Sequence, residues 1–377
     1  MLSFCGALAL APYSSSSSLS SRLRRLGMWL ALLLACVAAS GLLTYWHMPA
    51  GGFIGPMLVG IAFGVGGSEL RLPRRCFKLG QGTIGVLIAH TMTMSVLMTI
   101  LDGWLVMLLA TAITLLLSLL VGIGLVRYGG LPGSTAAWGT TPGAAAAMVA
   151  MAEEREDTDP RIVAAMQYVR VVCVVLVGAL VSHWLGAGDP AASSDGSGWP
   201  GDLAGLFDLA ITLAVVVGGV WLCDRRFPAG ALLGPMVIGS VLHLGGWGSL
   251  TIPTPLLLLA YGCIGVYVGL RFDRAALTTV ARSLGKMVIA SMLLIGLCAL
   301  SALLMVGLMD TQFITAYLAT SPGGLDSMTI IAIDTHADVG LVVALQTLRL
   351  FTVVLVGPAM ARFIARFARP MKSSASP

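Results

Sequence analysis

Two short segments contain the residues best suited to bind a solute. Residues 140–148 read TTPGAAAAM and residues 320–328 read TSPGGLDSM, so in each a hydroxyl residue precedes proline, as at a helix N-cap. A helix that starts there leaves its first N–H groups unpaired and carries a partial positive charge, while glycine lets a ligand approach the backbone. Both are therefore predicted to bind a solute, with plain turns between helices as the alternative. The candidate residues are Thr140, Thr141, Gly143, Ser321, Gly323 and Gly324.

A glutamine and an arginine follow each of these segments. Gln167 precedes Arg170, and Gln346 precedes Arg349, by three residues, which places each pair on one face of a helix. Both arginines lie inside apolar segments, where an unpaired arginine costs about 2.5–3.5 kcal/mol on insertion scales. They could bind an anionic substrate, since guanidinium matches carboxylate, or pair with an acidic residue of their own half. Those acidic residues are Glu153, Glu154 and Asp159 in the first half and Asp334 and Asp338 in the second.

One carboxylate, Asp326, lies within the second of the two segments, at a position where the first has Ala146. A carboxylate inside a membrane can carry a coupling proton or help to bind Na⁺. It can also interact with the dipole of the helix start that it follows. We predict that Asp326 is the coupling residue, with Asp334 and Asp338 as further candidates.

Metal, cofactor and enzyme chemistry find no support in the sequence. The five histidines and seven cysteines are dispersed, with no CxxC or HxxxH spacing. No metal site, cofactor or disulfide framework is therefore predicted. No nucleophile lies beside a suitable base, so we do not expect an enzyme.

The composition indicates a membrane protein. Of 377 residues, 57% are hydrophobic and 10% charged, and the mean hydropathy is +0.93, whereas soluble domains carry about 25% charged residues. The apolar residues suffice for roughly ten spans of about 20 residues. With no soluble basic domain, nucleic acid is excluded as a partner. The expected partners are the lipid bilayer and a small-molecule or ion substrate, with a homodimer as a candidate assembly.

The chain is an internal duplication of about 180 residues, with its spans divided between two halves. PAGGFIGPMLVG (49–60) matches PAGALLGPMVIG (228–239) at an offset of 179, and the two proline-containing segments match at 180. We predict a disordered cytoplasmic leader (1–27), repeat 1 (28–185), an extracytoplasmic linker (186–202), repeat 2 (203–366) and a cytoplasmic tail (367–377). The predicted spans are 28–46, 52–68, 80–100, 104–126, 161–185, 203–222, 230–245, 254–270, 284–308 and 338–362.

Positive charges alternate between connections in a way that reverses from one half to the other. Arg71, Arg74, Arg75 and Lys78 occupy a connection whose counterpart in the second half, GWGSLTIP, is uncharged. By the positive-inside rule, both termini are cytoplasmic and the two repeats are inverted in the membrane. Inversion requires an odd number of crossings per repeat, so 134–152 and 314–333 are predicted to be re-entrant. The predicted fold is an all-α polytopic membrane protein of two inverted repeats, each with about five transmembrane helices and one re-entrant half-helix hairpin; twelve crossings in parallel repeats are the alternative.

These motifs resemble the AbrB-type duplicated membrane proteins. The resemblance rests on two copies of PAGxxxGPMxxG, of T(T/S)PGxxxxM and of Q-x-x-R leading into VVLVG, over about residues 28–365. It implies a multi-pass inner-membrane protein, described in this family as an ammonia monooxygenase, a transition-state regulator or a transporter. The dispersed histidines do not support a monooxygenase, and the composition does not support DNA binding. The first copy departs from the second in having Ala144–Ala147 where the second has Gly324–Ser327.

The sequence therefore predicts secondary transport of a small anionic solute, coupled to H⁺ or Na⁺, by alternating access of inverted repeats. In this hypothesis the arginines neutralise the solute and the glutamines orient it. The alternative is a non-transporting integral membrane protein with an indirect role in the regulation of gene expression.

Overall fold

The fold is known from a computed structural model, which describes residues 19–91, 94, 98, 101–129, 133–141, 158, 160–185, 203–227, 230–246, 250–272 and 274–365. The predicted linker and cytoplasmic tail lie outside the described residues, as do Gly143, Ala146, Glu153, Glu154 and Asp159. Residues 19–27, predicted as part of a disordered leader, are helical, because Leu19, Leu23 and Leu26 extend the apolar pattern of the first span toward the N-terminus.

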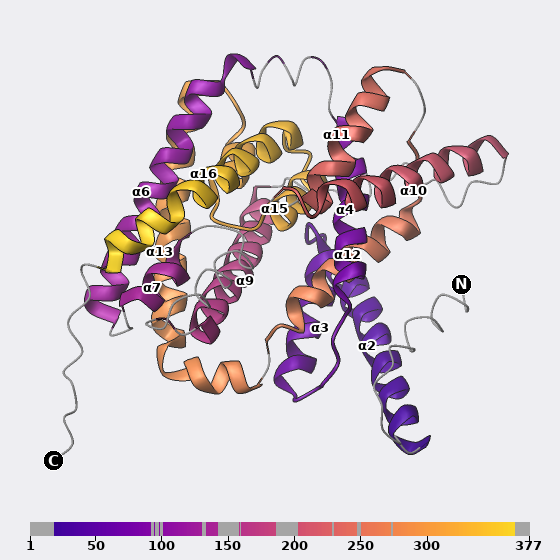
Figure 1. The fold of residues 1–377 in the computed structure, drawn as a ribbon, viewed down its shortest axis with the longest axis horizontal. Coiled ribbons are helices and arrows are strands. Elements are labelled where there is room, and N and C mark those ends of the chain that lie inside the picture. The colour runs from indigo at the N-terminus through magenta and orange to yellow at the C-terminus, as the bar shows by residue number, and fades with distance from the viewer. Residues whose placement is uncertain are drawn as a thin grey trace.

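All regular structure in these described ranges is α-helical (Figure 1). The same order of helices occurs twice, and equivalent helices begin about 180 residues apart. In the first half they are α2 (Leu19–Tyr45), α3 (Gly51–Val65), α4 (Arg74–Thr91), α6 (Trp104–Gly129), α7 (Gly133–Thr140) and α9 (Pro160–Trp184). In the second half they are α10 (Leu203–Cys223), α11 (Gly230–Leu244), α12 (Thr254–Gly269), α13 (Arg274–Met309), α14 (Phe313–Thr320), α15 (Leu325–Asp334) and α16 (Val339–Ala365).

Within the described ranges, six helices are long and apolar enough to cross a membrane: α2, α6, α9, α10, α13 and α16. Three others, α3, α11 and α12, are apolar but have only 15, 15 and 16 residues. A helix of 15 residues rises about 22 Å, less than the roughly 30 Å of a bilayer core. The prediction of an all-α polytopic membrane protein is confirmed, whereas ten full crossings and the inversion of the repeats stay predictions.

The long helices present large apolar side chains at the surface. Leu105 and Leu116 of α6 are 63% and 54% exposed, and Leu300 and Leu303 of α13 are 65% and 56% exposed. Exposing so extensive an apolar surface to water is unfavourable, whereas lipid tails accommodate it without cost. These faces are therefore lipid-facing.

The two halves pack mainly against each other. Helix α3 packs against α12 and α11 against α4, and in the same way α9 packs against α13 and α16 against α6. Glycines make the closest of these contacts. A Cβ at Gly85 would lie 2.3 Å from the Leu232 carbonyl oxygen, and one at Gly265 would lie 2.4 Å from that of Phe53. Small residues thus bring the backbones of the two halves together, as is usual between membrane helices.

Two groups of helices result, with α15 between them (Figure 1). One group contains α2, α3, α4, α10, α11 and α12, and the other contains α6, α7, α9, α13, α14 and α16. Helix α15 contacts α4 of the first group and α9, α14 and α16 of the second. The described candidate residues lie on α15, at the ends of α7 and α14, on α9, and on or just before α16.

Candidate functional site

The segment 314–333 is a helix broken into two. Helix α14 has 8 residues and ends at Thr320, and α15 has 10 residues and begins at Leu325 with Gly324 at its N-cap. The sequence predicted an N-cap at Ser321, which is wrong, because Ser321 instead follows the C-terminal end of α14 in an extended conformation. Proline disfavours the helical conformation of the residue before it, so Pro322 ends α14, and Gly323 and Gly324 delay the next helix.

The carbonyl groups exposed by this break are bound by Arg349 and Gln346. We call these hydrogen bonds the second network. The Nη2 of Arg349 donates to the Gly323 carbonyl at 2.7 Å, and its Nη1 donates to that of Ser321. The Nε2 of Gln346 donates to the carbonyls of Leu318 at 2.8 Å and Ser321 at 3.2 Å. The Gln346 Oε1 accepts from Arg349, so the two side chains support each other.

The first half repeats this arrangement at the end of α7, where Arg170 and Gln167 form the first network. The Nη1 of Arg170 donates to the Thr141 carbonyl at 3.1 Å and more distantly to that of Thr140 at 3.5 Å. The Nε2 of Gln167 donates to the carbonyls of Trp138 and Thr141, both at 3.0 Å. The Gln167 Oε1 accepts from Nη2 of Arg170 at 2.6 Å. The motif Q-x-x-R therefore binds carbonyls at the C-terminal end of an eight-residue helix in both halves.

This geometry gives the arginines a role that the sequence did not predict. The positive arginines lie at helix C-termini, where the last carbonyls carry partial negative charge. Arg170 and Arg349 are only 4% and 5% exposed. Asp334 and Asp338 contact other groups, and Glu153, Glu154 and Asp159 lie outside the described residues. Among the described residues, the arginines thus interact chiefly with the protein backbone.

The two networks lie side by side. Helix α7 packs against α16, which carries Arg349, and the two guanidinium groups are close enough for their charges to repel. Cys298 on α13 lies near both guanidinium groups. The network around Arg170 and the network around Arg349 are therefore neighbours in the fold.

Asp326 contacts a residue that sequence reasoning missed. In the first turn of α15, both of its carboxylate oxygens accept from Nε2 of Gln81 on α4, at 3.0 and 2.9 Å. Gln81 is 8% exposed. A polar amide within the apolar stretch LGQGTIGV was the available signal. The duplication does not repeat this pair, because the counterparts of Gln81 and Asp326 are Tyr261 and Ala146.

The other two coupling candidates lie apart from Asp326 and act at helix N-termini. Asp334 accepts from the backbone N–H of Ala50 at 2.8 Å, at the start of α3, where Ala50 has a left-handed φ of 57°. Asp338 accepts from the N–H of Leu341 at 3.0 Å, at the start of α16. Carboxylates stabilise helix N-termini in this way. Among the residues described, no group of three or more His, Cys, Asp or Glu side chains could hold a metal ion.

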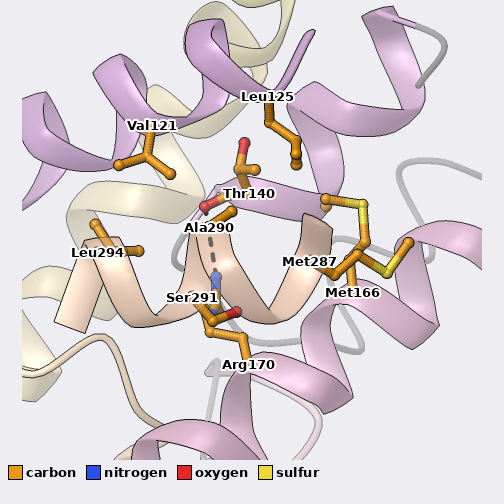
Figure 2. Close-up of a pocket in the computed structure, with 10 residues that line it drawn as sticks. Val121, Leu125, Thr140, Met166, Arg170, Met287, Ala290, Ser291 and Leu294 are labelled. Atoms are coloured by element: carbon orange, nitrogen blue, oxygen red, sulfur yellow. Dashed lines mark hydrogen bonds between the residues drawn. The ribbon is translucent and has the colours of Figure 1, made fainter. Parts of the chain in front are cut away.

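A small cavity of about 20 Å³ lies beside the first network, between α6, α7, α9 and α13 (Figure 2). Its polar lining comes from Thr140, Arg170 and Ser291, and the remaining wall includes Gly139, Met166 and Met287. The guanidinium group of Arg170 points toward Thr140 (Figure 2). The cavity is large enough for one water molecule or a single atomic ion.

Lipid-facing helices enclosing two buried, polar helix ends define a polytopic membrane protein with interrupted helices in its interior. The model of the AbrB family, described as transition state regulatory protein AbrB, matches residues 53–365. The chain belongs to this family, and the resemblance seen in its motifs is confirmed.

Two relatives match most of the chain. The protein named "Putative regulator AbrB" from Escherichia coli (strain K12) is 43% identical over 328 residues, which cover 87% of this chain and 93% of the relative. "Uncharacterized protein YhjN" from Bacillus subtilis (strain 168) is 27% identical over 309 residues, covering 77% of this chain and 79% of the relative. The similarity therefore includes both halves.

Proposed function

We propose that the protein is a secondary transporter of a small anionic solute, with both termini in the cytoplasm and the two repeats inverted in the inner membrane. The break between α14 and α15 is the observation that carries this proposal. Thr320 and Ser321, at the break, are both 0% exposed. Irregular backbone at membrane depth is tolerated only where protein buries it or where it lines a wet cavity. Paired breaks of this kind form the solute sites of inverted-repeat transporters.

The solute site is placed at the start of α15. The first N–H groups of a helix have no acceptor within the helix, and they attract an anion. Gly323 and Gly324 allow close approach, and Ser321 adds a buried hydroxyl without a hydrogen-bond partner. Thr140, Thr141 and Gly143 contribute from the first half. Arg170 and Arg349 act from the opposite side of the break, where they offset the solute's charge while holding the carbonyls, and the glutamines fix their orientation.

Asp326 supplies the coupling in this proposal. Its carboxylate lies in the first turn of α15, so while ionised it repels an anionic solute from the same helix end. A proton or Na⁺ on Asp326 removes that repulsion. Binding of the cation then favours binding of the anion, which is the linkage that symport requires.

Neutralising Asp326 also weakens the connection between the two groups of helices. Asp326 holds α15 to α4 through Gln81, and Asp334 holds it to α3 through Ala50. The charge-assisted hydrogen bond from Gln81 weakens when the carboxylate loses its charge. The group that contains α3 and α4 can then move against the group that contains α14 and α16, giving alternating access.

The test is uptake into proteoliposomes of radiolabelled acetate, succinate and glutamate under an imposed proton gradient or Na⁺ gradient. We expect wild-type protein to take up at least one probe faster when a gradient is present, and Asp326→Asn to lose the gradient dependence. Protein-free liposomes are the control. Equal uptake by all three preparations for every probe and gradient would contradict transport.

The second candidate is a membrane protein that affects gene expression without transport, which the name of the Escherichia coli relative favours. The two candidates separate when a deletion strain is complemented with Asp326→Asn. If this variant is inactive in transport but restores the wild-type transcript profile, regulation does not depend on transport.

A further inference from the structure

We propose that the end of α10 and the start of α4 together form a binding site for the headgroup of an anionic phospholipid. The two helices belong to different halves of the chain and pack against each other. Lys78 of α4 forms an ion pair with Asp224, the residue that directly follows α10. This ion pair fixes where the two helix ends meet. The proposal does not depend on the proposed transport activity.

Three exposed arginines lie beside this ion pair. Arg225 and Arg226 follow Asp224 along the chain, and both are exposed. Arg75, which is also exposed, precedes Lys78 by three residues, so it shares the face of α4 on which Lys78 meets Asp224. We call Arg75, Lys78, Arg225 and Arg226 the α4–α10 cluster.

The chemistry of the α4–α10 cluster suits a phosphate group. A guanidinium group can donate two parallel hydrogen bonds to one phosphate, and lysine binds phosphate as a compact charge. The arginines of the two networks are buried, whereas Arg75, Arg225 and Arg226 are exposed, so a phosphate can reach their guanidinium groups from outside the protein. Basic clusters beside membrane-spanning helices bind anionic lipid headgroups in this way.

The apolar surface beside the cluster favours a lipid over a soluble anion. Helix α10 is apolar enough to cross a membrane, and its apolar span ends at Cys223, directly before the cluster. Leu213, Val217 and Trp221 recur every four residues along α10 and are 42%, 55% and 81% exposed, so one face of the helix offers an acyl chain a continuous apolar path. Tryptophan is typical of the membrane interface, at the level of the headgroups. The cluster therefore lies where a lipid phosphate would be.

The equivalent place in the first half keeps the aromatic side chains without the cations. It lies between the end of α2 and the start of α12. Tyr45 and Trp46, at the end of α2, are 78% and 58% exposed. None of the residues that match the cluster is a lysine or an arginine: Trp46, His47, Pro255 and Leu258. The proposed headgroup site is therefore a property of the contact between α4 and α10 alone.

Native mass spectrometry of the purified full-length protein tests the site. The protein is held in detergent with equal amounts of phosphatidylglycerol and phosphatidylcholine that have the same acyl chains. We expect wild-type protein to retain phosphatidylglycerol in several-fold preference, and the double variant Arg225→Gln, Arg226→Gln to lose that preference. The matched control is Arg24→Gln, Arg25→Gln, which removes two adjacent exposed arginines from α2 and should keep it.

Equal retention of the two lipids by wild-type protein would overturn the proposal. So would an unchanged preference in Arg225→Gln, Arg226→Gln, or an equal loss in both double variants, which would indicate attraction to overall charge.

Thermal unfolding separates a lipid from a soluble anion. Phosphatidylglycerol should raise the Tm of wild-type protein by several degrees and inorganic phosphate should not. An equal rise with inorganic phosphate would assign the cluster to a soluble anion and overturn the lipid. Because neither measurement involves uptake, a protein that fails to transport any probe leaves this inference intact.

Discussion

The end of α7 in the first half and the end of α14 in the second share a framework but differ in the chemistry built on it. In both, a glutamine and an arginine bind the last carbonyls of an eight-residue helix. In the second half a carboxylate, Asp326, is held by Gln81 across the interface, at a position where the first half has Ala146. Only the first half places a glycine, Gly139, beside the cavity at Arg170. Duplication thus preserved the interactions that stabilise a helix break inside a membrane, while the residues around each break diverged.

The largest expected loss of stability comes from removing one of the arginines that cap a helix end in both halves. Arg349→Ala leaves the carbonyls of Ser321 and Gly323 without their charged donor, and hydrogen bonds to charged groups contribute about 1.5–3 kcal/mol each. We expect the free energy of unfolding to fall by about 3 kcal/mol or more. Arg170→Ala should cost less, since one of its carbonyl contacts is as long as 3.5 Å. Unfolding in detergent measures both, and equal stability of Arg349→Ala and wild type would refute the capping role.

Packing between the halves should respond equally to matched substitutions. In Gly85→Ala and Gly265→Ala, the new methyl group would lie 2.3 and 2.4 Å from a backbone carbonyl oxygen. This clash is relieved only if the helices separate. Overpacking of this kind typically costs about 1–3 kcal/mol. Thermal unfolding should show similar losses for the two variants. As controls, Gly124→Ala and Gly296→Ala meet nothing within 4 Å and should be neutral or slightly stabilising. A large loss in only one of the two test variants would mean that the interface is not duplicated.

The hydrogen-bonded pair of Asp326 and Gln81 can be tested by replacing Gln81. Gln81→Leu leaves the half-buried carboxylate of Asp326 without its donor, a penalty of about 1–3 kcal/mol. The loss should shrink in the double variant with Asp326→Asn, because a neutral amide is less costly to leave unpaired. A double-mutant cycle of unfolding free energies measures this coupling. Strict additivity would show that the two side chains do not interact.

The smallest effect is expected at the position equivalent to Gln81. Tyr261 is 3% exposed, and its hydroxyl is buried without a hydrogen-bond partner. Tyr261→Phe removes a polar group that is already unsatisfied, so stability should change by less than about 0.5 kcal/mol or increase. Chemical denaturation checks this value. A clear loss of stability would reveal a partner for the hydroxyl and would make the two positions more alike.

The sequence predicts the membrane class and the duplication well, because both depend on features that lie along the chain. Apolar composition requires lipid, and repeated motifs at an offset of about 180 show the duplication directly. The helix break at Pro322 follows from local conformational preference. The prediction that Ser321 begins a helix was wrong, because it follows the end of one. Local sequence does not predict which residues bind the break, because Gln346 and Arg349 reach it from a separate helix, α16. The contact of Gln81 with Asp326 joins residues 245 positions apart, and no local pattern predicts such a pairing.

The exchange of partners between the halves has a consequence for biosynthesis. Helices α3 and α4 leave the ribosome first, yet the surfaces that cover their glycines belong to α12 and α11. Helices α3 and α4 must therefore wait in the bilayer, inserted but without these partners, until α11 and α12 have been translated. In that interval the early half needs lipid or an insertion factor to shield those grooves.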